Sequence, residues 1–325
     1  MATPGAENHI VDVAGLKVGH AHNAPVNTGA SVILMDKPAT AAVAVAGGGP
    51  GTRETDLLSA GMLVDSVDAV VLSGGSAYGL AAADGVAASL GAQGRGFAMT
   101  KTPGIPNTPI VPAAILYDLA NGGNKAWADT PPYQTLGKEA LTNASRDSDL
   151  GRIGAGYGAR AGQVQGGVGS ASIMTRDGFT VGALAAVNCF GSVYMPGSEV
   201  FWAWPYEVAN EFGGQRPVTD YCLDAEDWGT AKINPALGQN TTIACIATDI
   251  TLSPSDAQRV ANMTLAGFAR AIRPVFAPFD GDAVFVVSTA QKPLPEPDAL
   301  SLTRLGELAA STLARAIARG VFHAK

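Results

Sequence analysis

Hydrophobic and polar positions along this chain follow two periods, and each period indicates one type of secondary structure. Short apolar runs with few polar interruptions are typical of strands that are buried on both faces. Such runs predict strands at residues 31–35, 41–46, 68–72, 181–188 and 283–288. The alanine-rich stretch 77–90 predicts a helix. Its small side chains favour close packing against a neighbouring layer.

Two more helices are predicted in the last quarter of the chain. Ser253 and Pro254 fit the N-cap and the first position of a helix. Apolar residues then recur at helical spacing at Ala257, Ala261, Leu265, Phe268 and Ile272. A final helix ends near Gly320, with an apolar face at Leu302, Leu305, Ala309 and Leu313. Because helices and strands interleave throughout, the predicted class is α/β or α+β with layered sheets and helices.

The region between Cys189 and Gly238 departs from both periods. It contains spaced prolines and an acidic cluster, namely Pro196, Pro205, Pro217, Pro235, Asp224, Glu226 and Asp227. Prolines and acidic residues without periodicity are typical of irregular surface structure. We interpret this region as a surface excursion that leads up to Thr241.

The composition indicates a large buried core. Hydrophobic residues make up 47% of the 325 residues and charged residues only 15%, which fits one large α/β domain or two average domains. The net charge of −7 argues against a nucleic-acid partner. No run approaches the roughly 18 apolar residues needed to span a membrane. A cytoplasmic location is predicted, because no signal peptide is evident and three scattered cysteines fit a reducing compartment.

Three glycine-rich segments follow apolar runs, at residues 47–52, 73–76 and 154–170. Each can present backbone N–H groups to an anion or a reaction oxyanion, or can simply form the tight turns that sheet packing requires. Neither of the first two has the spacing of a phosphate loop or of a dinucleotide fingerprint. The four histidines lack the carboxylate or cysteine partners of a metal set. We therefore expect no metal and no cofactor.

Asn240 and Thr241 form a polar turn that runs directly into an apolar strand. This is ordinary turn chemistry, but cleavage between the two residues would make Thr241 an N-terminal residue. Its hydroxyl would then be a nucleophile, and its α-amine, with an ordinary pKa of about 8, could accept the hydroxyl proton. Asp280 and Asp282 at the next strand start form either a simple turn or a pair that orients an amine or hydroxyl. Asn188 ends an apolar strand and can donate to an oxyanion.

The motifs fall in an order that resembles the L-aminopeptidase/D-esterase (DmpA-type) family. They are GGPGTRETDLL at 48–58, SGGSAYGL at 73–80, VPAAILYD at 111–118, the glycine cluster around Gly166, NTTI at 240–243 and PFDGD at 278–282. The resemblance covers nearly the whole chain. It implies a four-layer α/β/β/α sandwich, without metal or cofactor, that hydrolyses amide bonds of small peptides or amide oligomers.

The resemblance also implies self-processing. The single catalytic domain 1–325 would cut itself between Asn240 and Thr241 into an α chain 1–240 and a β chain 241–325. The two chains would stay associated, as a tetramer of such αβ pairs. Thr241 is the implied nucleophile. Tyr117 and Asn188 fall where the family places hydrogen-bond donors to the reacting carbonyl, and Asp280 and Asp282 fall where it places polar contacts to the nucleophile.

The motif details are most similar to the nylon-oligomer hydrolase branch, because a threonine follows Asn at the cut and Asp-Gly-Asp follows downstream. Many members carry a lysine in the glycine cluster, where this chain has Gln163 and Gln165. Glutamine donates hydrogen bonds but supplies no charge. The cationic contribution must be weaker here or come from elsewhere. Gly75, Ser76, Gln163 and Gln165 are the predicted oxyanion or substrate contacts.

Two alternatives remain open from the sequence. An acyltransferase of the ornithine acetyltransferase type also cuts itself before a threonine, although there the cut usually follows Ala. An uncleaved small-molecule binding protein would use the glycine turns for an anion and keep an intact chain. The sequence does not decide between α-peptides, β-peptides and oligomers of ω-amino acids as substrates. The acidic pair favours a substrate with a cationic amine end.

Overall fold

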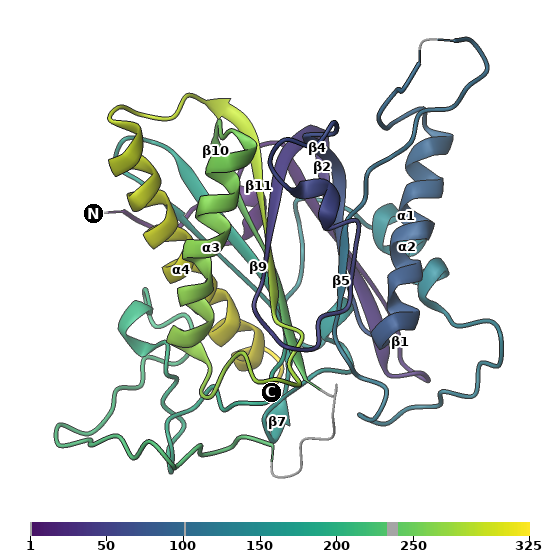
Figure 1. The fold of residues 1–325 in the computed structure, drawn as a ribbon. Coiled ribbons are helices and arrows are strands. Elements are labelled where there is room, and N and C mark those ends of the chain that lie inside the picture. Colours follow the sequence, from purple (N-terminus) through teal and green to yellow (C-terminus); the bar gives the residue numbers. More distant parts are fainter. Residues whose placement is uncertain (1, 101, 233–239) are drawn as a thin grey trace.

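The computed structural model describes residues 2–100, 102–232 and 240–325. Its main sheet is mixed and, within these residues, has nine strands in the order β3-β5-β4-β2-β11-β10-β9-β8, with β1 paired to β2 (Figure 1). The strands are β1 (Leu16–Asn23), β2 (Thr28–Val45), β3 (Thr52–Arg53), β4 (Ser66–Ser73), β5 (Ala113–Ile115), β8 (Gly167–Met174), β9 (Thr180–Asn188), β10 (Thr241–Ile250) and β11 (Ala283–Lys292). A separate ribbon pairs β6 (Arg160–Ala161) with β7 (Val164–Gln165).

Four α-helices flank the sheet: α1 (Ala81–Ala92), α2 (Tyr133–Thr142), α3 (Pro254–Ala271) and α4 (Asp298–Phe322). Short 3-10 turns lie at Ile10–Asp12, Asp56–Leu58, Ser76–Leu80, Gly154–Gly156 and Trp204–Tyr206. The predicted helix at 77–90 is confirmed in type. Its first turn is the 3-10 turn Ser76–Leu80, and α1 continues from there.

Strand β2 joins the two halves of the sheet. Its first part pairs with β1 and β4, and its last part pairs with β11, with a register shift between Leu34 and Ala39. The two strands predicted at 31–35 and 41–46 are therefore one 18-residue strand. The prediction left the polar residues Asp36 and Lys37 outside both strands. In the structure these residues lie exposed in the middle of a continuous strand.

Three apolar cores separate four layers. One core packs α3 and α4 against β8, β9, β10 and β11, and another packs α1 and α2 against β1, β2 and β4. The third lies between the two halves of the sheet and contains residues such as Ile33, Leu72, Ile243 and Phe285. Figure 1 shows the helix pairs on opposite sides of the strands. The α/β class and the layer order α/β/β/α are confirmed.

The predicted start of α3 is also confirmed. Ser253 Oγ accepts a hydrogen bond from the Asp256 N–H at 3.2 Å, and Pro254 takes the first helical position. The Asp256 carboxylate in turn accepts from the Ser253 N–H, which completes a capping box. Such a cap stabilises a helix by roughly 1 kcal/mol.

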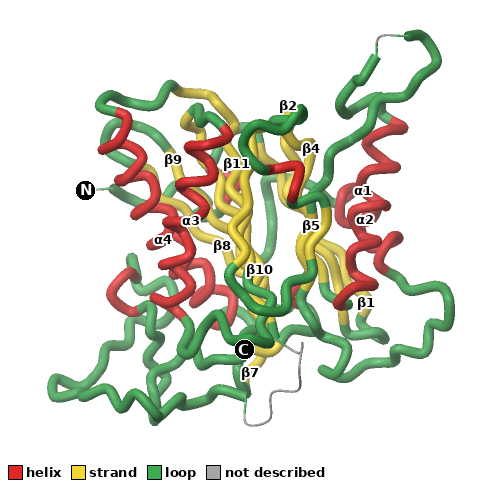
Figure 2. The backbone as a smooth tube through the Cα atoms, in the orientation of Figure 1, coloured by secondary structure: helices red, strands yellow, loops and turns green. Residues whose placement is uncertain are grey.

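The region from Cys189 to Lys232 is irregular, as the sequence predicted, and runs below the strands as loops in Figure 2. Its only described helical turn is Trp204–Tyr206. Residues 233–238 of the predicted excursion lie outside the described residues. Among the residues that the structure describes, no helix combines the length and the apolar character needed to cross a membrane.

Candidate active site

The first residue of β10 lies at the centre of the candidate site. Thr241 pairs with Asn188 at the end of β9, and Asn240 forms a bridge with Asp280 just before β11. The strand order therefore brings Asn188, Thr241 and Asp280, which are far apart in sequence, together at the same end of three neighbouring strands. Asn240, Thr241, Asn188 and Asp280 are all buried.

The Thr241 hydroxyl donates a hydrogen bond to the carbonyl oxygen of Asn240, the residue that precedes it. This carbonyl belongs to the peptide bond that the sequence predicts to be cut. On its other side the hydroxyl packs against Gly281, where an added Cβ would come within 2.7 Å of Thr241 Oγ. A glycine at position 281 thus leaves the space that the hydroxyl occupies. The Asp-Gly-Asp turn therefore packs against the Thr241 hydroxyl as well as leading into β11.

The two carboxyls of this turn are buried and hydrogen-bonded to backbone. Asp282 accepts from the Thr242 N–H at 2.6 Å and from the Phe276 N–H at 3.2 Å, and Asp280 accepts from the Ala277 N–H at 3.1 Å. Burial raises the pKa of both carboxyls, and the charge of Asp280 raises the pKa of Asp282 further. Two close carboxyls in a dry site hold a proton more strongly than either would in water.

The glycine run 47–49 packs directly onto this turn. Gly49 N–H donates to the Asp280 carbonyl at 2.7 Å, and Gly47 N–H donates to the Asp282 carbonyl at 3.2 Å. A Cβ at Gly47 would lie 2.3 Å from the Asp280 carbonyl oxygen. Side chains larger than hydrogen therefore cannot fit here. For this segment the packing interpretation holds, because the N–H groups of Gly47 and Gly49 bind backbone carbonyls.

The Asn188 amide is oriented by its neighbours. Its Oδ1 accepts from the Asn121 side chain at 3.1 Å and from the Arg160 N–H at 2.8 Å. Because both partners are donors, the amide nitrogen is fixed at the other end, where it donates to the Tyr117 carbonyl at 2.9 Å. Tyr117 thus reaches Asn188 through its backbone. Its predicted role as a side-chain donor stays a prediction.

The other predicted contacts are bonded within the fold. Gly75 N–H donates to the buried Asp118 carboxylate at 2.8 Å, and Ser76 N–H donates to the Leu116 carbonyl at 3.0 Å. The Gln163 amide donates to the Ala231 carbonyl at 3.0 Å, and the Gln165 amide donates to the Ala159 carbonyl at 2.8 Å. Their predicted role as oxyanion or substrate contacts stays a prediction.

Two polar residues at the site were missed from the sequence. Asn121 fixes the Asn188 amide, and Lys232 places its Nζ 3.3 Å from the Asn188 carbonyl oxygen. Asn121 follows the motif at 111–118 by only three residues, so its proximity to that motif was the available signal. Lys232 lies in the irregular excursion, where no period or motif marks it.

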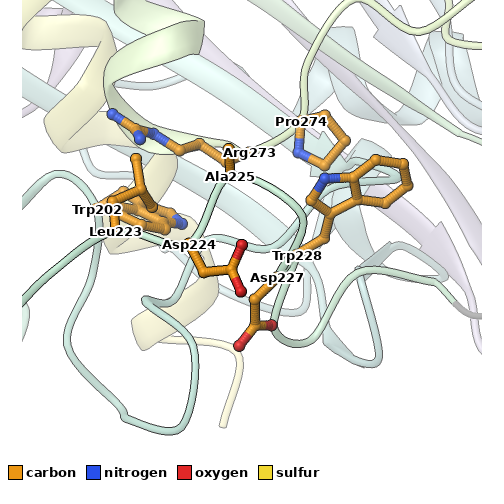
Figure 3. A pocket seen from close by; sticks show the side chains of 8 residues that line it. All are labelled: Trp202, Leu223, Asp224, Ala225, Asp227, Trp228, Arg273 and Pro274. Carbon is orange, nitrogen blue, oxygen red and sulfur yellow. The ribbon is translucent and has the colours of Figure 1, made fainter.

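A pocket lies next to the site. Trp228 contacts Phe190, with ring centroids 6.0 Å apart, and Phe190 contacts Phe279, which directly precedes Asp280. Beyond Trp228 is a cavity of about 240 Å³ (Figure 3), lined by Trp202, Leu223, Asp224, Ala225, Asp227, Trp228, Arg273 and Pro274. In this view the two indole rings lie on either side of the Asp224 carboxylate. The cavity joins aromatic walls to acidic side chains.

The histidines serve the structure. His20 is bonded to Ser31 at 2.8 Å and to Ser148 at 2.9 Å, and burial lowers its pKa to about 3. Within the described residues, no group of three or more His, Cys, Asp or Glu side chains is placed to hold a metal ion. The three cysteines are not disulfide-bonded.

Comparisons with known proteins identify the family of the chain. The sequence model of peptidase family S58 matches residues 8–325. An uncharacterized aminopeptidase of Mycobacterium tuberculosis is 40% identical over 98% of this chain and 94% of its own length. A 6-aminohexanoate-oligomer endohydrolase of Kocuria sp. is 30% identical over 93% of this chain and 80% of its own length.

Among solved structures, the L-aminopeptidase D-Ala-esterase/amidase of Ochrobactrum anthropi, described as a variant of the Ntn-hydrolase fold, has a TM-score of 0.68. It is 19% identical, and the match covers 98% of this chain and 87% of that one. The chain belongs to peptidase family S58. It is a hydrolase that acts on amide bonds.

Proposed function

We propose that this hydrolase is self-processing, cuts itself between Asn240 and Thr241, and then uses Thr241 as an N-terminal nucleophile. The observation that carries the proposal is the hydrogen bond from the Thr241 hydroxyl to the Asn240 carbonyl. This hydrogen bond supports the proposal because it directs the Thr241 hydroxyl to the Asn240 carbonyl in a buried region that also holds two carboxyls. A threonine that only enters a strand needs no such surroundings.

In the first reaction the Thr241 hydroxyl attacks the Asn240 carbonyl carbon. The C–N bond breaks, the Thr241 nitrogen takes a proton, and an ester joins the two residues. Water then hydrolyses the ester, which leaves a carboxylate on Asn240 and an α-amine on Thr241. The α chain 1–240 and the β chain 241–325 would stay together, because β10 pairs with β9 and β11 pairs with β2, and both β9 and β2 belong to the α chain.

In the mature enzyme the same hydroxyl attacks a substrate amide. The Thr241 α-amine accepts the hydroxyl proton and passes it to the leaving amine, and water hydrolyses the acyl-enzyme. Asn188 is proposed to stabilise the oxyanion, since its backbone pairs with Thr241 and its side chain carries an amide donor. Asp280 and Asp282 are proposed to hold the amine and the hydroxyl in place.

The proposed substrates are small peptides or amide oligomers with a cationic amine end. Support comes from the negative charge of the acidic pair and from the neighbouring pocket, which offers Asp224, Asp227 and Trp228 to an ammonium group. The Trp202 ring is covered by the Arg273 guanidinium, 4.3 Å from the ring centroid. One of the relatives is named for acting on 6-aminohexanoate oligomers. A screen of aminoacyl amides, β-peptides and ω-amino-acid oligomers would identify the preferred class.

We extend the proposal to a tetramer of αβ pairs in the cytoplasm. Apolar side chains that are at least half exposed, among them Met62, Leu63 and Met99, offer surface that subunit contacts would cover. Light scattering after size-exclusion chromatography would give the assembly size. A monomeric αβ pair at micromolar concentration would contradict this part of the proposal.

Self-processing is tested by intact-mass analysis and denaturing gels. We expect the natural chain to give two fragments that end at Asn240 and begin at Thr241. Thr241→Ala should remain one chain of 32.9 kDa without hydrolase activity. Thr241→Ser, which keeps a hydroxyl, is the matched control and should still be cut. Fragments of the same size from Thr241→Ala would refute the proposal.

A further inference from the structure

Lys232 is hydrogen-bonded to the last residue of β9 by its side chain and to Phe190, just after β9, by its backbone. Its N–H donates to the Phe190 carbonyl at 3.0 Å, and its Nζ donates to the Asn188 carbonyl at 3.3 Å. The lysine thus bonds on both sides of Cys189. Since Asn188 pairs with Thr241, the ammonium lies beside the strand position of the nucleophile.

Among the described residues, the titratable and charged groups that act on Lys232 come from three segments. They are Asp280 before β11, the Cys189 thiol after β9 and Arg160 in β6. Burial lowers the pKa of Lys232 to about 8, while Cys189 and then Asp280 oppose this effect. In return the lysine lowers the pKa of Asp280, against the stronger effect of burial. Burial raises the pKa of the Cys189 thiol to about 12, so the thiol stays neutral.

The acidic pair therefore needs a cation to remain charged. Asp282 is fully enclosed and feels the charge of Asp280. A buried carboxyl without a nearby cation takes up a proton and loses the charge that can hold an ammonium group. Arg160 is committed elsewhere, because its guanidinium donates to the Gln163 carbonyl at 2.8 Å. Gln163 and Gln165 supply no charge.

We propose that Lys232 is a positioning residue whose ammonium keeps Asp280 ionised, so that the acidic pair can hold the Thr241 hydroxyl before cleavage and its α-amine afterwards. This inference rests on the proposed function. Many family members carry a lysine in the glycine cluster. In this chain the inference assigns that positive charge to Lys232, in the excursion that precedes the cut. The two hydrogen bonds described above join Lys232 to Asn188 and Phe190, which all lie before the cut, so cleavage of the Asn240–Thr241 bond should leave these two bonds in place.

The test compares pH profiles of self-cleavage and of amide hydrolysis. Lys232→Gln keeps a hydrogen-bond donor for the Asn188 carbonyl but removes the charge. We expect the acidic limb of both pH–rate profiles to move to higher pH by about one unit in this variant. Without the lysine charge, Asp280 loses its proton only at a higher pH. Lys232→Arg should return the acidic limb to its position in the natural enzyme, because arginine carries the positive charge. Lys17→Met, at an exposed lysine 3.5 Å from Asp36, is the control and should leave the profile unchanged.

A double-mutant cycle with Asp280→Asn identifies the path of the effect. If the lysine acts through Asp280, Lys232→Gln should change the acidic limb no further once Asp280 is neutral. If Lys232→Gln does not fold, Lys232→Met replaces it in both measurements. An unchanged acidic limb in the folded variant, or a full shift in the Asp280→Asn background, would overturn the inference. Failure of the natural chain to cleave or hydrolyse would instead refute the proposed function.

Discussion

Two regions border the candidate site, and they differ in almost every physical respect. The sheet segment β9–β10–β11 is regular, with the first eight residues of β10 paired on one or both sides and all ten buried. The excursion from Cys189 to Lys232 is nearly all loop, and it exposes large side chains such as Trp228 and Val218. The first region supplies Thr241, Asn188 and the acidic pair. The second supplies Lys232 and the pocket beyond Trp228.

The difference teaches how the two tasks of an enzyme are divided in this fold. Catalytic groups require fixed geometry, and a strand register within a buried sheet holds it with many hydrogen bonds. Substrate recognition tolerates more variation, and irregular segments can change sequence without disturbing the core. Changes in the sheet segment should therefore alter the rate of the chemical step. Changes in the excursion should alter binding or the charge state of the site.

The largest effect is expected at Asn188. If its amide stabilises the oxyanion, Asn188→Ala should lower kcat by about 10²- to 10³-fold with little change in KM. Steady-state kinetics on the best amide substrate would measure this. Asn262→Ala, on the exposed face of α3, is the control and should leave kcat unchanged. A kcat within twofold of the natural enzyme would place the oxyanion donor elsewhere.

An intermediate effect is expected for Asp282→Asn, on how the free energy of unfolding changes with pH. The folded chain raises the pKa of this carboxyl above the ordinary value of 3.8, so between these two values the folded state binds more protons than the unfolded state. Its contribution to the free energy of unfolding is therefore greatest below 3.8 and is lost as pH rises through the folded pKa. Asp282→Asn should flatten this decline.

Chemical denaturation at several pH values from about 4 to about 8 measures the effect. The two carboxyl oxygens of Asp282 accept hydrogen bonds from two backbone N–H groups, and asparagine has only one oxygen to replace them. The resulting loss in the free energy of unfolding should be the same at every pH. Only the slope therefore tests the prediction. Asp65→Asn, at an exposed position before β4, is the control. Parallel stability curves for the natural chain and Asp282→Asn would contradict a raised pKa at this residue.

The smallest effect is expected in the excursion. Trp228 is 50% exposed, and its ring lies between the pocket and Phe190. Trp228→Ala should raise KM for amine-ended substrates by roughly three- to tenfold, with kcat and Tm nearly unchanged. Leu300→Ala, which removes another exposed side chain far along the sequence on α4, should change neither constant. A fall in kcat without a change in KM would place Trp228 among the groups that act in the chemical step.

The periodic parts of the chain could be predicted, and the reason is local. The cap at Ser253, the apolar face of α3 and the buried run of β9 each follow from neighbouring residues. The break predicted between residues 35 and 41 was wrong. Asp36 and Lys37 are exposed residues within β2, which continues from one half of the sheet to the other. The continuation of β2 depends on pairing with β4 and β11, whose residues lie far along the chain.

By itself the sequence determined the α/β class, the position of Thr241 at a strand entrance and the six ordered motifs that identify the family. Only the tertiary structure decided which groups meet there. The orientation of the Asn188 amide depends on Asn121, and the charge of the acidic pair depends on Lys232. Neither dependence leaves a pattern in sequence, because hydrogen bonds and electrostatic interactions across a sheet edge depend on distance in space. Spacing along the chain does not reveal that distance.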